Sequence, residues 1–363
     1  MTVKLMYLVS HPIQYQAPLL QLIAALPDLS LRVVFEKTLD ESPQYDPGFE
    51  MEFQWDIPLT EGYDNTPLAE TELGQEIERC DVLWLHGWQT RAMRRAIGIA
   101  WRSGKPVLMR GENCELAMPD GKGLIGLVKR PYLRWIFRRC RAFLTIGHEN
   151  EKYYLARGVT LERMFPTPYA IDNIRFSEAA VDGRAGRRDF KISLGLDPDQ
   201  PVILYAGKLM ARKRPELLVR AFQQADFGNL SPQLVFVGEG EMDAALRRLA
   251  PDTLFLGFQN QRQLPALYDM ADLFVLPAVR EPWGLAVNEA MACSTAVVVS
   301  DQVGCASDLV TADCGAVFPA GDVAALAGAL VHCLENSNAM GQAAKTAIDG
   351  WGFDGPGGLV ARE

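Results

Sequence analysis

Residues 273–292 read LFVLPAVREPWGLAVNEAMA, and this stretch contains a complete change from strand to helix. Its first part, LFVL, is apolar throughout, as a strand buried in a parallel sheet should be. Its last part, from Leu285 onward, is rich in helix formers. Between them, Pro282 suits the entry to a helix, and Gly284 allows the backbone to approach a ligand closely. The stretch therefore predicts a strand, a short loop and a helix of an α/β sheet.

The same alternation continues on both sides of this stretch. In the second half, the expected strands are PVILYAGKL, PQLVFVGEG, DTLFLGF, TAVVVSD and GAVFPA. In the first half they are VKLMYLVS, LRVVFEK, VLWLHG, PVLMRGEN and AFLTIG. Residues 40–76 are expected to form a long loop with one helix, and 178–200 a linker with a short helix. Short apolar strands separated by helices indicate parallel sheets, and 363 residues suit two such domains.

Composition excludes several classes of protein. The net charge of −9 argues against nucleic-acid binding by bulk electrostatics. No apolar run is long enough to span a membrane, and the apolar start VKLMYLV is too short for a secretory leader, so we expect a buried first strand. The seven cysteines are scattered, which favours reduced thiols in a cytoplasm. The four histidines lack metal-ligand spacing, so we expect no metal and no cofactor.

Ligands of parallel α/β sheets bind beyond the carboxyl ends of the strands. The strand PVILYAGKL ends at Gly207 and Lys208, and Lys213 follows just before a helix that begins near Pro215. Cations beside a helix amino terminus predict a phosphate site; the alternative is a solvated basic loop. Gly238 and Gly240 lack the third glycine of a dinucleotide fingerprint, and we interpret them as a tight turn.

Two glutamates in the quoted stretch can reach one ligand. Glu281 lies in the loop, and Glu289 lies about one and a half turns inside the helix. Helical side chains lean toward the amino terminus, so the Glu289 carboxylate can point back to the loop. The amide groups near Gly284 and Leu285 are available to an anion at the start of the helix. Carboxylates beside a phosphate site suit hydrogen bonds to sugar hydroxyls.

These motifs resemble the carboxy-terminal domain of the family 4 retaining glycosyltransferases, from about residue 201 to residue 336. The first half resembles the family more loosely, through DVLWLHGW, AFLTIG and PYAIDNIRF. The resemblance implies the GT-B fold, an α/β architecture of two Rossmann-like, doubly wound parallel-sheet domains that face a central cleft. It implies an acceptor domain at 1–175, a donor domain at 176–345, and a closing segment, 346–363, that returns toward the first domain.

The resemblance also implies roles for individual residues. Lys208 stands where the family usually has Arg, and Lys213 matches the family's Lys; both are implied to contact the donor diphosphate. Glu281 is implied to contact the transferred sugar, and Glu289 the ribose. Lys208, Lys213 and Glu281 are thus the implied catalytic residues. The implied substrate-binding positions of the same domain are Gly207, Phe258 (at the base), Trp283 (where Phe is commoner), Gly284, Leu285 and Glu289.

The first domain departs from the family pattern. Many members carry a histidine near the sugar, where this chain offers Arg110 and Glu112, while His86 ends the preceding strand. Which of the three approaches the donor sugar stays open, and His86 is equally consistent with a structural histidine. In the first loop, His11, Gln14 and Tyr15 replace the family's glycines. They predict a polar, aromatic acceptor pocket.

The expected function is transfer of a sugar, with anomeric retention and without a metal, from a UDP- or GDP-sugar to an acceptor hydroxyl. The acceptor is a sugar or a lipid-linked sugar of bacterial surface polysaccharide or glycolipid assembly. A nucleotide-sugar epimerase, or another GT-B enzyme that transfers no sugar, is the alternative.

The charge of the chain is unevenly distributed. Residues 91–141 hold thirteen Lys or Arg and three Asp or Glu, a local charge of +10 that leaves about −19 elsewhere. Within this range, GLIGLVKRPYLRWIFRRCR mixes basic and aromatic residues. It is either a solvated helix with core aromatics or a surface that contacts anionic lipid. The second interpretation predicts a cytoplasmic protein at the inner face of the membrane.

Overall fold

The computed structural model describes residues 2–353 apart from 38–43, 47–50, 117–122 and 185, and it leaves the side chains of several further residues, including 123–128, undescribed. These residues form two compact units. The first comes from residues 2–37 and 57–169, and the second from 44–56 and 170–353. The chain therefore contributes to the second unit twice. The predicted domain limits stay predictions, and most of the closing segment, 354–363, lies outside the described residues.

The first unit contains a parallel sheet of seven strands in the order β5-β2-β1-β6-β7-β8-β9. The central strands are apolar and buried, as the sequence predicts. In chain order the strands are β1 (Val3–Val9), β2 (Leu29–Phe35), β5 (Asp64–Pro67), β6 (Val82–His86), β7 (Val107–Arg110), β8 (Ala142–Thr145) and β9 (Met164–Pro166). The helices are α1 (Ala17–Ala24), α2 (Leu73–Arg79), α3 (Arg91–Arg102), α4 (Gly123–Phe137) and α5 (His148–Leu155), with 3-10 turns η1 (Leu68–Glu70) and η2 (Leu161–Arg163).

The second unit contains a parallel sheet of six strands in the order β12-β11-β10-β13-β14-β15. The strands are β10 (Val202–Ala206), β11 (Gln233–Val237), β12 (Leu254–Phe255), β13 (Leu273–Leu276), β14 (Ala296–Ser300) and β15 (Gly315–Phe318). The residues of β10, β13 and β14 are all buried, which is the environment that continuous apolar runs require.

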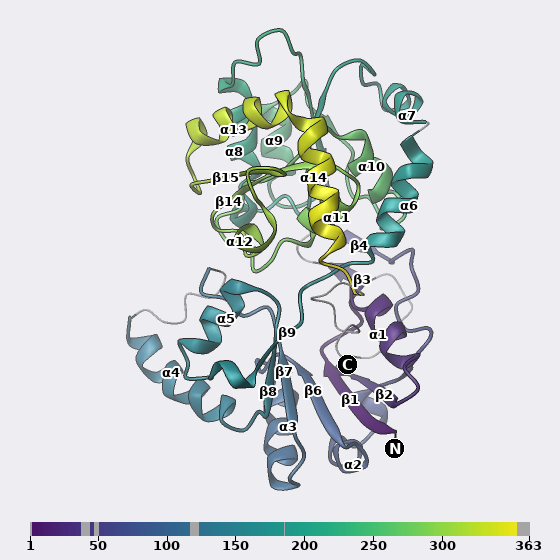
Figure 1. Cartoon of the computed structure of the whole chain (residues 1–363), viewed down its shortest axis with the longest axis vertical. Helices are drawn as coiled ribbons and strands as arrows, with labels where there is room; N and C mark the ends of the chain where they lie inside the picture. Colours follow the sequence, from purple (N-terminus) through teal and green to yellow (C-terminus); the bar gives the residue numbers. More distant parts are fainter. Residues whose placement is uncertain (1, 38–43, 47–50, 117–122, 185, 354–363) are drawn as a thin grey trace. The chain divides into compact units, whose positions relative to one another are not determined.

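The helices of the second unit pack in two groups. One group contains α8, α9 and α13, and the other contains α6, α10, α11 and α14, with α14 alongside α11 (Figure 1). Their bounds are α6 (Asn173–Arg184), α7 (Arg187–Ser193), η3 (Ala211–Lys213), α8 (Pro215–Gln224), α9 (Asp243–Leu249), α10 (Leu264–Met270), α11 (Leu285–Ala292), α12 (Ala306–Leu309), α13 (Val323–Glu335) and α14 (Ser337–Asp349). Within the described part of the chain, no helix is both long and apolar enough to cross a membrane.

The predictions for residues 40–76 and 178–200 were incomplete. The first range contains the antiparallel pair β3 (Gln44–Asp46) and β4 (Met51–Phe53), the edge strand β5, η1 and α2. Strand β5 has the sequence DNTP, and its proline is tolerated because the strand lies at the edge of the sheet. In the second range, two helices, α6 and α7, replace the expected linker with one short helix.

Candidate functional site

The loops that follow β10, β11 and β12 are joined directly through their glycines. The Gly207 N–H donates to the Val237 carbonyl at 2.9 Å, and the Gly238 N–H donates to the Gly257 carbonyl at 2.7 Å. Gly238 has φ +121°, and a Cβ there would lie 2.1 Å from the Gly207 carbonyl oxygen. Only glycine fits this position. The structure thus supplies a packing reason for the tight turn after β11.

Lys213 ends the 3-10 turn η3, between β10 and α8, and its ammonium lies 2.9 Å from Glu281 Oε2. Arg212, which the sequence analysis did not select, donates to the same oxygen at 3.1 Å and to the Arg280 carbonyl at 3.0 Å. Lys208 is half-buried at the start of the same loop, and its carbonyl accepts from the Tyr205 hydroxyl at 2.9 Å. Predicted Lys213 and Glu281 are therefore in direct contact, and a second cation joins them.

Glu281 is buried and ionised. Its N–H donates to the Gln302 carbonyl at 3.2 Å, and its carbonyl accepts from the Gly304 N–H at 3.0 Å, so the loop is fixed on both sides. Burial acts to raise the pKa of the Glu281 carboxyl, but the charges of Lys213 and Arg212 outweigh it and hold this pKa below its ordinary value. The site thus holds a carboxylate between two cations.

Gly284 immediately precedes α11 and has φ +100°, a left-handed conformation that favours glycine. A Cβ at this position would lie 2.9 Å from the Cγ1 atom of Val303, so the absent side chain serves packing within the unit. The Val287 N–H donates to the carbonyl of Gly284 at 2.8 Å, whereas the amides of Leu285 and Ala286 precede the first helical hydrogen bonds and give the start of α11 a partial positive charge. The helix start at which an anion is predicted to bind therefore lies beside Glu281, and the binding itself stays a prediction.

The side chain of Trp283 packs inside the second unit. The indole is 3% exposed, its Nε1 donates to Asn288 Oδ1 at 3.0 Å, and its ring stacks on Trp351 with centroids 5.8 Å apart. Its backbone carbonyl also accepts from the Cys305 N–H at 3.0 Å. Trp283 thereby anchors the loop that carries Glu281, and its predicted contact with substrate stays a prediction.

Glu289 differs in charge from Glu281. It lies in the second turn of α11, and its Oε2 accepts a hydrogen bond of 2.7 Å from the hydroxyl of Tyr268 on α10. Burial raises the pKa of the Glu289 carboxyl to about 7, against the smaller opposing effects of Tyr268, Arg175 and Lys213. Near neutral pH the Glu289 carboxyl is therefore partly protonated, whereas the Glu281 carboxyl is ionised.

Phe258 follows β12 and is half-buried, and its N–H approaches Glu239 Oε1 at 3.4 Å. Its ring makes an edge-to-face contact with that of Trp55, which belongs to the part of the second unit contributed by residues 44–56. The predicted base position is therefore next to an aromatic residue that the sequence analysis did not connect with it.

The first unit gathers several predicted residues around one carboxylate. Glu112 Oε1 accepts from the Tyr15 hydroxyl at 2.8 Å and also from the Tyr169 hydroxyl. The buried Arg110 guanidinium lies 5.2 Å from the centre of the Tyr169 ring and donates to the Pro168 carbonyl at 3.3 Å. Tyr169 was missed because nothing in PYAIDNIRF distinguishes it from a core tyrosine.

His86 ends β6 near this group, and its Nδ1 lies 3.2 Å from Nε2 of Gln16. Burial, followed by the charge of Arg110, lowers the pKa of His86 to about 3, so the ring is neutral at physiological pH. His11 is exposed and lies 2.8 Å from the Ser10 hydroxyl, and Gln14 is half-buried in the same loop after β1. A neutral imidazole can share hydrogen bonds with hydroxyls but adds no charge.

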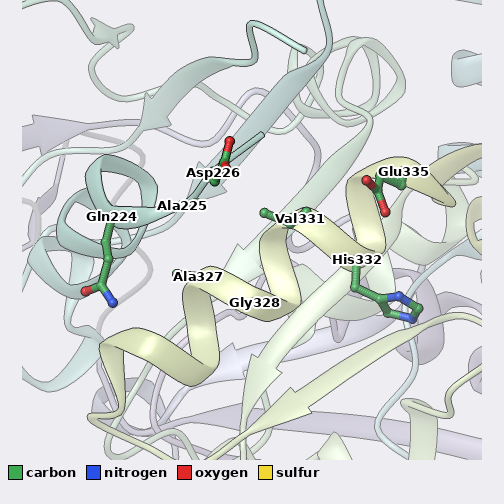
Figure 2. Close-up of a pocket in the computed structure, with 8 residues that line it drawn as sticks. All are labelled: Gln224, Ala225, Asp226, Ala327, Gly328, Val331, His332 and Glu335. Carbon is green, nitrogen blue, oxygen red and sulfur yellow. The ribbon is translucent and has the colours of Figure 1, made fainter. Parts of the chain in front are cut away.

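A separate groove of about 410 Å³ lies in the second unit, and Figure 2 shows its lining residues at the end of α8 and along α13. These residues are Gln224, Ala225, Asp226, Ala327, Gly328, Val331, His332 and Glu335. In a parallel α/β sheet a helix ends at the edge where the next strand begins, so this groove lies opposite the edge that carries Lys213 and Glu281. It plays no part in the site described above.

Comparisons with known proteins point to glycosyltransferases. Residues 186–349 match the family described as Glycosyl transferases group 1. A glycosyltransferase of Methanocaldococcus jannaschii is 38% identical over 122 residues, which cover 32% of this chain and 31% of that protein. A GDP-mannose-dependent monoacylated alpha-(1-6)-phosphatidylinositol monomannoside mannosyltransferase of Corynebacterium glutamicum is 30% identical over 202 residues, or 52% of each chain. The matches thus span between about a third and a half of these relatives' lengths.

Solved structures match over nearly the whole chain. The crystal structure of Anabaena HepE in complex with UDP and glucose has a TM-score of 0.70, at 15% identity, and covers 96% of this chain and 94% of that one. Sucrose-phosphate synthase from Thermosynechococcus elongatus has a TM-score of 0.69, at 19% identity, and covers 97% and 96%. At these identities the likeness establishes the fold. Residues 186–349 are therefore a group 1 glycosyltransferase domain, on a chain with the GT-B fold.

Proposed function

We propose that this protein transfers a sugar from a nucleoside diphosphate sugar to an acceptor hydroxyl, with retention of anomeric configuration. The observation that carries the proposal is the group formed by Lys213, Arg212 and Glu281 beside the start of α11. Two cations and a helix amino terminus are suited to a diphosphate, and a carboxylate among them is suited to hydroxyls of the attached sugar.

The diphosphate is the leaving group, and its negative charge grows as the bond to the sugar breaks. Lys208, Lys213 and the first amides of α11 stabilise this charge, and the ammonium of Lys213 is held in place by Glu281 before the reaction begins. Because Lys213 is paired with Glu281 in the free protein, the donor phosphate shares this cation with the carboxylate. Cationic groups that meet the leaving charge make a metal ion unnecessary in the proposed reaction.

The two glutamates then have different tasks. Glu281 stays ionised between its cations and accepts hydrogen bonds from hydroxyls of the transferred sugar. Glu289, with Tyr268 as its neighbour, accepts from the ribose hydroxyls. In a retaining transfer, an oxygen of the donor phosphate takes the proton of the acceptor hydroxyl on the face from which the phosphate leaves. The proposed reaction therefore needs no dedicated protein base.

The acceptor is proposed to bind the first unit. Glu112, oriented by the hydroxyls of Tyr15 and Tyr169, and the neutral ring of His86 offer hydrogen bonds to the hydroxyls of a sugar. The Corynebacterium relative is named for a phosphatidylinositol mannoside. We therefore favour a lipid-linked acceptor, in the assembly of a glycolipid or a surface polysaccharide.

The face of α4 supports contact with a membrane surface. Leu133, Ile136 and Phe137 are buried, whereas Trp135 is 54% exposed and stacks with Tyr132. Outside the helix, the Arg139 guanidinium lies 3.5 Å from the centre of the Trp135 ring and 4.8 Å from that of Trp101. This combination of cationic and aromatic groups suits the headgroup region of anionic lipid.

The function is tested by incubating the protein with UDP- and GDP-sugars, with and without glycolipid acceptors. Release of the nucleoside diphosphate, together with a new glycoside whose anomeric configuration by NMR equals that of the donor, is the expected result. A glycoside with the opposite configuration would contradict retention. A changed sugar that remains attached to its nucleotide would instead indicate an epimerase.

A further inference from the structure

Residues 54–56 belong to the first half of the sequence but are fixed to a loop of the second unit. The Gln54 carbonyl accepts from Asn260 Nδ2 at 2.7 Å, and the Asp56 N–H donates to Asn260 Oδ1 at 3.3 Å. The Asp56 carboxylate in turn accepts from the Arg262 N–H at 3.1 Å. Hydrogen bonds on both sides of Trp55 thus hold its backbone against the loop that follows β12.

Trp55 and Phe258 form an aromatic corner at this place. Their ring centroids are 6.3 Å apart, with the ring planes at 61°, and both side chains are half-buried. Each side chain keeps part of its surface exposed, and aromatic rings favour packing against further planar rings.

The aromatic corner lies within reach of the diphosphate site. Strand β12 is two strands from β10 in the sheet, a separation of about 10 Å. Arg175 connects the proposed ribose site with this loop: its charge acts on Glu289, and the same guanidinium donates to the side chain of Gln261 at 3.1 Å, next to Asn260. A nucleoside whose diphosphate meets Lys213 therefore extends toward Phe258.

We propose that Trp55 forms one wall of the donor site and, beside Phe258, packs against the heterocyclic base of the nucleoside diphosphate. The inference rests on the proposed function and adds a binding residue from the first half of the chain. Asp56 and Asn260 act as positioning residues, because they fix the backbone of Trp55.

The test is titration calorimetry of UDP, GDP and inorganic pyrophosphate with the full chain. Trp55→Ala is expected to weaken nucleotide binding about tenfold, the usual loss when a base loses an aromatic partner, and Trp55→Phe to restore most of it. Pyrophosphate lacks a base and should bind all variants equally. The matched control is Phe227→Ala, which removes a half-buried ring from another aromatic pair, with Phe222, in the same unit.

Tryptophan fluorescence gives an independent readout that does not depend on the folding of the alanine variant. Nucleotide, but not pyrophosphate, should change the fluorescence of the natural protein, and the change should be smaller in Trp55→Phe. Three results would each overturn the inference. They are nucleotide binding by Trp55→Ala as tight as by the natural protein, a nucleotide-induced fluorescence change in Trp55→Phe as large as in the natural protein, and an equal loss of affinity for pyrophosphate and nucleotide in Trp55→Ala. A natural protein that binds neither nucleotide nor pyrophosphate would instead overturn the proposed function.

Discussion

At the scale of single residues, the two glutamates show how neighbouring side chains set the protonation state of a carboxyl group. Both were expected to act as carboxylates, and the residue type and spacing give no reason to distinguish them. Lys213 and Arg212 keep Glu281 ionised, whereas burial beside Tyr268 raises the pKa of Glu289 to about 7. The neighbours come from other segments of the chain, so their effect could not be read from residues 273–292.

Replacing Lys213 with Ala should lower kcat about 100-fold or more, because one preorganised cation that stabilises the leaving charge is lost. The fold should remain, since Arg212 still pairs with Glu281. Lys345→Ala is the matched control, because Lys345 pairs with Asp349 on the surface of the same unit. Steady-state kinetics and circular dichroism measure the two effects, and near-natural turnover in Lys213→Ala would show that the diphosphate binds elsewhere.

Glu289 should make the second unit less stable as pH rises. Because its folded pKa is raised above the ordinary value of 4.5, its contribution is fully present below pH 4.5 and is lost as pH rises through about 7. Glu289→Gln removes this dependence, so its free energy of unfolding relative to the natural protein should increase by about 1–3 kcal/mol between pH 5 and pH 8. Urea denaturation measures the difference, and parallel pH profiles would contradict the assigned shift.

At the scale of elements, the central strands were predictable and the edges were not. Strands β10, β13 and β14 are buried on both faces, so apolar runs identify them. Strands β5 and β9 are short, lie at the edges of their sheet and contain proline, so neither propensity nor pattern marks them. Helix α14 was also missed, because its run SNAMGQAAKTAID has few large apolar residues.

The candidate site follows the same division. Lys213 and Glu281 were predicted to serve one site from their places at strand ends, and they are in contact. Arg212, Tyr268 and Trp55 were not predicted, because their importance depends on contacts between segments distant in the sequence. Position along a parallel sheet thus predicts where a site lies, and tertiary packing decides which side chains complete it.

The turn after β11 can be tested with a pair of glycines. Gly238→Ala should lower the free energy of unfolding by about 2 kcal/mol or more, because it adds a clash to a left-handed backbone. Gly328→Ala in α13 has nothing within 4 Å of the new Cβ and should leave stability equal or raise it by up to about 1 kcal/mol. Chemical denaturation compares them, and equal stability of both variants would contradict the packing argument.

The face of α4 predicts salt-sensitive binding to anionic vesicles, each basic residue contributing about 1 kcal/mol near the surface. The double variant with Trp135→Ala and Arg139→Ala should bind less, since it removes the stacked pair. Lys152→Ala, in a surface pair with Glu149 of the same unit, is the control. Vesicle flotation at low and high salt measures binding, and absence of binding by the natural protein would remove the proposed membrane contact.

At the scale of the whole molecule, one buried group in each unit makes stability depend on pH, and the two effects have opposite signs. His86 is neutral in the folded first unit, with its pKa lowered to about 3, whereas the unfolded chain protonates it below its ordinary pKa of 6.5. Its contribution to stability is therefore present above pH 6.5 and is lost as pH falls. Glu289 in the second unit loses its contribution as pH rises.

His86→Gln should therefore make unfolding of the first unit less sensitive to acid. Between pH 7.5 and pH 5 the natural protein should lose about 1–2 kcal/mol more than the variant. Thermal unfolding at the two pH values measures this difference, with His332→Gln as a control on the surface of α13. An equal loss in the natural protein and in His86→Gln would show that the imidazole is already protonated in the fold.

The hydrogen bonds between residues 54–56 and the loop at Asn260 have a consequence for protein engineering. A hybrid built by exchanging carboxy-terminal halves between two such enzymes would transfer the lysines, both glutamates and Phe258, but would keep the recipient's tryptophan segment. An excised fragment that starts at residue 170 would likewise leave Asn260 and Arg262 without these partners. A recombinant second unit must therefore also carry residues 54–56 from the first half of the sequence.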